Sequence, residues 1–182
     1  MAHLPVTLPE ILAARERLSG RIHRTPLLSS ATAAREIAGQ TGIELADGRL
    51  YAKAEHLQLT GSFKPRAAFN RIASLTPAER ARGAVTLSAG NAGQAYAWAG
   101  REAGVPVTVV MPTGAVASKV AACRAYGARV VLHGETVGEA LRRVEELVAE
   151  GLTLVHPYDQ PEVIAGNASL GLDLLEDLPE VD

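Results

Sequence analysis

The stretch AVTLSAGNAGQAYAWAGREAGVPVTVVM, residues 84–111, decides the fold. It begins with the apolar run 84–88, which is typical of a buried strand, and continues through small residues into a helical pattern over 92–103. A second apolar run, 105–111, follows. Because parallel neighbouring strands need a crossover connection, usually a helix, this order predicts a parallel β-α-β unit.

The same alternation continues on both sides of this unit. Further strands are expected over 50–55, 128–132 and 152–156, with an extended segment over 22–28. Further helices are expected over 7–20, 30–38, 65–75, 77–83, 115–126, 137–150 and 161–178, and a loop or hairpin over 39–48. The pattern predicts the α/β class, with an open parallel sheet and helices on both faces. The sheet stops early, since no strand follows the last expected helix.

Composition narrows the classes of partner. The 182 residues are 47% hydrophobic and 21% charged, an ordinary composition for a soluble protein. A formal net charge of -2 argues against a nucleic-acid partner and against an anionic lipid surface. The single cysteine, Cys123, excludes an internal disulfide and a multi-cysteine metal site, and it favours a reducing, cytoplasmic location.

Several motifs are missing from the sequence. Residues 1–7 contain no basic segment followed by an apolar one, so no signal peptide is expected. The apolar run within 105–111 is too short to span a membrane. The sequence contains no P-loop pattern, G-x-G-x-x-G or zinc-protease motif. No metal site is expected, because metal-ligand spacing is absent among His3, His23, His56, His133 and His156.

Lys64 is one of only three lysines, and it lies in TGSFKPR, residues 60–66, at the expected start of a helix. A helix N-terminus carries partial positive charge, so this position disfavours an ammonium group. The neutral amine, which such a setting favours, can condense with an aldehyde to form a Schiff base, and arginine cannot do so. The alternative interpretation is an ordinary surface lysine.

The loop 88–94, SAGNAGQ, is the second candidate site. Backbone N–H groups at the start of the following helix could bind a carboxylate or a phosphate, with Gly90 and Gly93 allowing close approach. The alternative is a plain turn in which Asn91 caps the helix.

Taken together, these segments make the sequence similar to the fold-type II pyridoxal-phosphate enzymes, and within them to the threonine/serine dehydratase (threonine ammonia-lyase) group. The resemblance implies the tryptophan synthase β-like fold and pyridoxal 5'-phosphate as cofactor. It rests on motifs spread over almost the whole chain: RTPL (24–27), TGSFK (60–64), SAGN (88–91), VVMP (109–112), YGA (126–128), HPYD (156–159) and VIAG (163–166).

The resemblance also implies residue roles. Lys64 matches the lysine that holds the cofactor and later acts as a base near the substrate Cα. Phe63 matches the residue that packs on the cofactor ring, and Asn91 matches the side chain that hydrogen-bonds the cofactor's phenolic oxygen. The substrate carboxylate would be bound by the backbone of Ser88, Ala89, Gly90, Asn91 and Ala92.

The implied activity is β-elimination from L-threonine or L-serine, giving a 2-oxo acid and ammonia, in an enzyme of amino-acid metabolism that forms a homo-oligomer. Threonine synthase and serine racemase are alternatives of the same fold. Racemases in this family usually carry a second serine in the asparagine loop, whereas this chain has Ala89, which favours elimination.

The resemblance covers only the first half of such an enzyme, so the fold is expected to be truncated. It implies that residues 1–82 begin the large domain, 83–157 form the small domain, and 158–182 return to an incomplete large domain. The glycine-rich loop that holds the cofactor phosphate cannot be assigned here. A catalytically inactive fragment, prone to self-association or instability, is therefore the alternative from another functional class.

Overall fold

A computed structural model describes residues 6–181 of the chain. Its helices are α1 (Leu8–Leu18), α2 (Ala31–Thr41), α3 (Lys64–Ala73), α4 (Pro77–Arg82), α5 (Asn91–Ala103), α6 (Ala117–Ala125), α7 (Val137–Ala149) and α8 (Pro161–Asp177). Two short 3₁₀ turns, η1 (Glu55–Leu57) and η2 (Leu59–Gly61), precede α3. The strands are β1 (Leu27–Ser30), β2 (Leu50–Lys53), β3 (Ala84–Leu87), β4 (Val107–Met111), β5 (Arg129–Leu132) and β6 (Thr153–Leu154). Residues 1–5, to which the expectations about His3 and a signal peptide belong, lie outside the described part.

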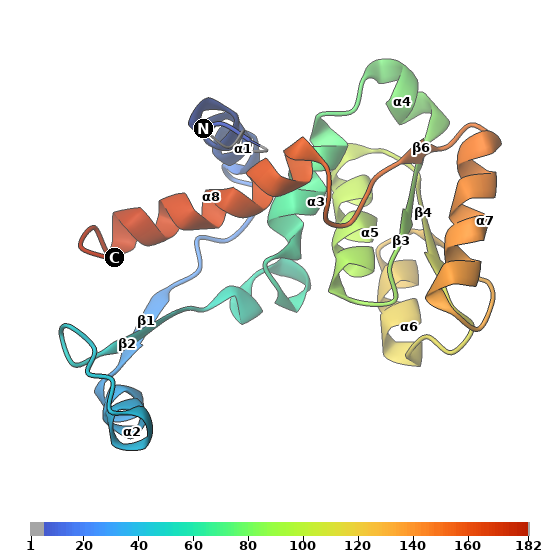
Figure 1. Ribbon diagram of the computed structural model, residues 1–182. Helices are drawn as coiled ribbons and strands as arrows, with labels where there is room; N and C mark the ends of the chain where they lie inside the picture. Colours follow the sequence, from blue (N-terminus) through green and yellow to red (C-terminus); the bar gives the residue numbers. More distant parts are fainter. Residues whose placement is uncertain (1–5, 182) are drawn as a thin grey trace, which may run out of the picture.

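Four strands form the parallel sheet that the sequence predicts, in the order β5-β4-β3-β6 (Figure 1). Side chains alternate along these strands, so that Val109 packs into the apolar cluster with α5 and α6, and Val110 packs against α7. Helices therefore cover both faces of the sheet. Both strand valines are fully buried, which explains why β4 is apolar without a polar face.

The first two strands depart from the expected arrangement. β1 and β2 pair antiparallel with each other in a separate two-stranded sheet, which extends with α2 away from the larger sheet (Figure 1). Leu28 and Leu50 are exposed on it. The sequence predicts the extended segments but not their partners, because strand pairing depends on residues distant in the chain.

Most element boundaries differ from the expectation by a few residues, and α2, α5 and β6 are examples. α2 continues beyond residue 38 to Thr41 and ends at Gly42, whose φ of 73° is the left-handed conformation typical of a helix end. α5 begins one residue early, at Asn91. β6 is only two residues long because the chain turns at His156, whose Nδ1 accepts the backbone N–H groups of Tyr158 and Asp159.

Helix α8 packs against α1 and α3, so the end of the chain contacts its beginning (Figure 1). The closest approach is at Gly166, where an added Cβ would lie 2.6 Å from the Arg66 carbonyl oxygen and 2.8 Å from the Ala67 Cα. Both neighbours are backbone atoms, so they cannot move aside independently of α3. This contact fixes the helix that begins with Lys64.

We expect Gly166→Ala to lower the free energy of unfolding by about 2 kcal/mol, because the methyl group overpacks the α3–α8 contact. Gly171→Ala is the matched control, since Gly171 lies in the same helix with open space around its Cα. This control should raise stability by about 0.5–1 kcal/mol through helix propensity. Urea unfolding of the two variants checks the prediction, and equal effects would contradict it.

Beside this contact lies a buried ion network, defined here as Arg66, Glu55, Asp173, Ser169 and Thr25. The Arg66 guanidinium donates two hydrogen bonds of 2.9 Å to Glu55 and one of 2.8 Å to Asp173, and its side chain is 2% exposed. Burial alone would raise the pKa of Glu55, but hydrogen bonds from Arg66 and Thr25 outweigh it and hold that pKa below its usual value. The network joins α3, α8, η1 and the segment before β1.

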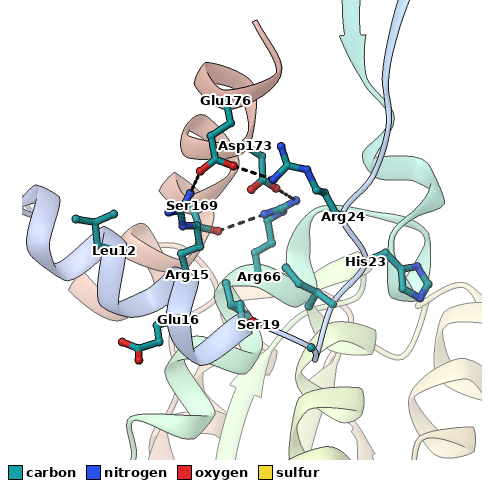
Figure 2. Close-up of a pocket in the computed structure, with 13 residues that line it drawn as sticks. Leu12, Arg15, Glu16, Ser19, His23, Arg24, Arg66, Ser169, Asp173 and Glu176 are labelled. Carbon is teal, nitrogen blue, oxygen red and sulfur yellow. Dashed lines mark hydrogen bonds and ion pairs between the residues drawn. The ribbon is translucent and has the colours of Figure 1, made fainter. Parts of the chain in front are cut away.

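A cavity of about 680 Å³ lies next to Arg66, between α1 and α8 (Figure 2). Three of its charged side chains pair with one another, since Glu176 accepts from both Arg15 and Arg24. Lys64 does not line this cavity. None of the helices formed by residues 6–181 is both long and apolar enough to span a lipid bilayer.

Candidate functional site

Lys64 is the first residue of α3, as the sequence predicts, and it follows a constrained turn. Thr60 adopts φ 60°, a left-handed conformation that costs a non-glycine residue about 1–2 kcal/mol. The turn is fastened by Gln58, whose Oε1 accepts the backbone N–H groups of His23 and Leu59 and whose Nε2 donates to the His23 carbonyl oxygen. Sequence reasoning missed Gln58, because this residue lies outside the TGSFK motif, four residues before Ser62, and belongs to no other motif.

The Lys64 amine lies between two aromatic rings. Its Nζ is 4.7 Å from the centroid of Phe63 and 5.0 Å from that of Tyr158. Ring faces favour an ammonium ion, yet burial lowers the pKa of Lys64 below the usual value for lysine. The sequence predicts that the helix N-terminus disfavours the ammonium form, whereas in the folded chain it is burial that lowers the pKa. Either cause increases the share of neutral amine at a given pH.

The other two lysines have partners. Lys53 Nζ forms an ion pair of 2.6 Å with Asp177, and its side chain is 5% exposed. Lys119 Nζ donates a hydrogen bond of 2.6 Å to Asn91 Oδ1. Within residues 6–181, Lys64 alone among the three has neither a hydrogen-bond acceptor nor a carboxylate partner for its amine.

The loop between β3 and α5 is shaped by Ser88. Its Oγ accepts the N–H groups of Gly90, at 3.3 Å, and Gly93, at 2.9 Å. The N–H groups of Ala89, Asn91 and Ala92 make no hydrogen bond with any other residue of 6–181. These three groups, at the positive end of α5, remain available for an anionic ligand.

The sequence predicts that Gly93 allows a ligand to approach, but in the structure the absence of a side chain at Gly93 serves the packing of α5. A Cβ there would lie 2.7 Å from the Ser88 carbonyl oxygen and 3.1 Å from Val109 Cγ1, so it allows α5 to pack on the sheet. Gly90 has open space around its Cα, which agrees with the expected approach of a ligand. Gly90, and not Asn91, occupies the capping position, so the Asn91 side chain is free of that role.

A cavity of about 600 Å³ brings the two predicted segments together. Lys64 and all five residues of 88–92 line it, along with residues of the 156–158 turn. Another part of its lining comes from α7, through the apolar Val137, Leu141, Val144 and Val148 and the carboxylate of Glu145. Phe63 does not line the cavity; it is partly exposed, and the Lys64 amine lies over its ring.

Sequence reasoning did not assign Tyr158 and His156 to the site. The His156 side chain holds the turn through the two backbone N–H groups it accepts, and the turn places the Tyr158 ring beside Lys64. The HPYD motif served only to support the resemblance, although a conspicuous turn after a strand of the sheet is itself a signal for a site.

The geometry accords with similarity to known proteins. Residues 18–182 match the sequence family described as "Pyridoxal-phosphate dependent enzyme". The chain belongs to this family. L-threonine dehydratase catabolic TdcB of Escherichia coli K12 is 43% identical over 180 residues, which cover 98% of this chain and 52% of that relative.

Solved structures of the family confirm the fold-type II class. Serine racemase from Dictyostelium discoideum is 37% identical with a TM-score of 0.86, covering 98% of this chain and 56% of the other. The T.th. threonine deaminase is 40% identical with a TM-score of 0.80, covering 95% and 52%. The chain thus spans about half the length of the relatives it matches.

Pyridoxal phosphate is the cofactor on which this family depends, and the residues present fit it. The unpartnered Lys64 amine suits the cofactor's aldehyde, and the cavity volume lies within the range of small-molecule sites. The free N–H groups of the asparagine loop suit an anionic group beside it. The cofactor and its lysine would therefore lie at the carboxyl end of β3, where ligands bind in parallel α/β sheets.

Proposed function

We propose that this chain binds pyridoxal phosphate at Lys64 and serves the β-elimination of L-threonine or L-serine, giving a 2-oxo acid and ammonia. One observation carries the proposal: the partly buried, unpartnered Lys64 amine opens into the same cavity as the 88–92 loop. The dehydratase and deaminase names of relatives at 43% and 40% identity support this reaction class.

When bound, pyridoxal phosphate supplies a conjugated ring that delocalises the electron pair left on Cα after deprotonation. The other steps belong to residues of this chain. Lys64 Nζ would hold the cofactor through its aldehyde carbon. Once the substrate amino group replaces it there, the freed Lys64 amine would take the Cα proton as a base. The free N–H groups of Ala89, Asn91 and Ala92 bind the substrate carboxylate and orient it.

Two further side chains complete the proposed roles. The Asn91 amide binds the phenolic oxygen of the cofactor ring. The resemblance assigns Phe63 to packing on the ring; Phe63 contacts the Lys64 amine although it does not line the cavity. The apolar side chains of α7 line another part of the cavity and exclude water from it.

Racemisation is the second candidate, because racemase structures are similar at 37% and 36% identity. It requires a proton donor on the face of Cα opposite Lys64. Ala89, where racemases of this family usually carry a serine, has no proton to give. Ala89 therefore favours elimination, in which the β-hydroxyl leaves and no second donor to Cα is needed.

Product analysis of the chain loaded with pyridoxal phosphate tests the proposal. L-Threonine or L-serine should yield 2-oxo acid and ammonia in equal amounts, measured by a hydrazone assay and by ammonia titration. Chiral chromatography of the remaining serine should show little D-serine. D-Serine without 2-oxo acid would favour the racemase, and the absence of any product would favour the catalytically inactive alternative.

We also propose the domain division 1–82, 83–157 and 158–182. The continuous parallel sheet from β3 to β6 supports the middle unit, and the packing of α8 on α1 and α3 supports joining the outer two.

A reducing, cytoplasmic location is proposed from the single cysteine, Cys123, which is buried. Burial raises the pKa of the Cys123 thiol to about 11, which disfavours thiolate chemistry. Assembly into a homo-oligomer is part of the same proposal.

A further inference from the structure

Lys119 lies in an electrostatically unfavourable position. It is the third residue of α6, whose N-terminus carries partial positive charge, and it approaches the first residue of α5, which is a second such end. No carboxylate pairs with its ammonium group within residues 6–181. Its one hydrogen bond there is to Asn91 Oδ1, at 2.6 Å. An ammonium group in this position gains nothing from the two helix dipoles, and its hydrogen-bond acceptor among the described residues is the amide oxygen of Asn91.

This contact fixes the orientation of the Asn91 amide. An ammonium group can only donate hydrogen bonds, so the atom facing Lys119 must be the amide oxygen. The NH₂ end of Asn91, with its two donors, then points away from Lys119. Asn91 lines the cavity that contains Lys64, and its side chain makes no other hydrogen bond within the described part of the chain.

We infer that Lys119 is a positioning residue, which holds the Asn91 amide with its NH₂ group available to an acceptor oxygen in the cavity. Without Lys119, either end of the amide could face the cavity, and the oxygen end would repel a ring oxygen. The positive charge also polarises the amide and strengthens its donors. That the acceptor is the phenolic oxygen of pyridoxal phosphate rests on the proposed function; the orientation of Asn91 does not.

Three variants separate the effect of the Lys119 charge on Asn91, the effect of its donor geometry, and the general effect of removing a cation from the protein. Lys119→Met keeps about the same side-chain length and removes the hydrogen-bond donor to Asn91. Lys119→Arg keeps a cationic donor at this position. Arg124→Met is the matched control, because Arg124 is exposed on the same helix and removing it changes the net charge equally. Circular dichroism verifies that all three variants fold.

The first readout is the side-chain NH₂ signal of Asn91 in ¹H–¹⁵N NMR spectra of the cofactor-free chain, assigned by its disappearance in Asn91→Asp. We expect Lys119→Met to shift this signal, Lys119→Arg to move it less, and Arg124→Met to leave it unchanged. A signal that Lys119→Met does not move would overturn the inference, whether or not the chain binds the cofactor.

The second readout is pyridoxal-phosphate binding, measured after borohydride reduction as the adduct on the Lys64 peptide, so that labelling of Lys119 itself is not counted. We expect Lys119→Met to weaken binding about tenfold and Lys119→Arg to restore it to within about twofold. Equal binding by wild type and Lys119→Met would also overturn the inference. If the wild-type chain takes up no cofactor at Lys64, the proposed function fails, and the NMR readout alone decides the role of Lys119.

Discussion

Replacing Lys64 with alanine is expected to abolish 2-oxo acid formation, lowering the rate by at least about a thousandfold. The same variant should lose the visible absorption band that the cofactor gives when it is bound to the lysine. The reason is chemical: Lys64 is the one lysine whose amine has no partner within residues 6–181, and alanine offers no nitrogen to bind the aldehyde or to take the Cα proton. Coupled spectrophotometry measures the rate, and an absorption spectrum measures the band.

Two control variants test whether the loss of activity is due to the missing Lys64 amine. Lys64→Arg keeps the positive charge but cannot condense with an aldehyde, so it should be as inactive as Lys64→Ala. Lys53→Arg keeps the ion pair with Asp177 and should retain the activity of the wild-type chain. Product formation by Lys64→Ala would show that the assigned lysine is wrong.

Replacing Arg66 with methionine is expected to lower the free energy of unfolding by about 3–5 kcal/mol at neutral pH. The guanidinium of Arg66 is 2% exposed and bonds to both Glu55 and Asp173. Its removal leaves two buried carboxylates facing each other without a cation. Urea unfolding measures the loss, with Arg101→Met as the control: Arg101 forms a surface ion pair with Glu102 and should contribute less than about 1 kcal/mol.

The pH dependence of this loss has a definite sign. In the wild-type chain the pKa of Glu55 is held below its unfolded value, so Glu55 contributes stability above that value and loses it as pH falls through the folded pKa. In Arg66→Met the hydrogen bonds from Arg66 are gone and only the one from Thr25 still opposes burial, so the pKa of Glu55 should rise. The difference between variant and wild type should therefore be largest near pH 7 and should shrink below about pH 5. A difference that does not vary with pH would contradict the assignment of Glu55.

Local signals made most of the fold predictable. Capping boxes at Thr7 and Thr76 mark the starts of α1 and α4, and both are present in the structure. The apolar runs 84–88 and 105–111 became β3 and β4 because each is buried on both faces. These features depend on residues within a few positions of one another, and the same holds for the placement of Lys64 at the start of α3.

Interactions between distant residues could not be predicted. The antiparallel pairing of β1 with β2 depends on which strand each one meets, and the sequence does not encode that partner locally. The same limit applies to the site. Lys119 reaches Asn91 from 28 positions away, and the Tyr158 ring lies 5.0 Å from Lys64 Nζ from the turn after β6. Lys119 could not be assigned to the site from the sequence, because only the packing of α6 beside α5 reveals its contact.

The capture of an aldehyde cofactor by Lys64 is tested most directly by mapping where the cofactor attaches. The chain is mixed with pyridoxal phosphate, reduced with borohydride and digested, and the adduct on each lysine is quantified by mass spectrometry. We expect the adduct to be concentrated on Lys64, since Lys53 is buried in an ion pair and Lys119 is hydrogen-bonded. Equal labelling of the three lysines, or labelling mainly at Lys119, would contradict the account.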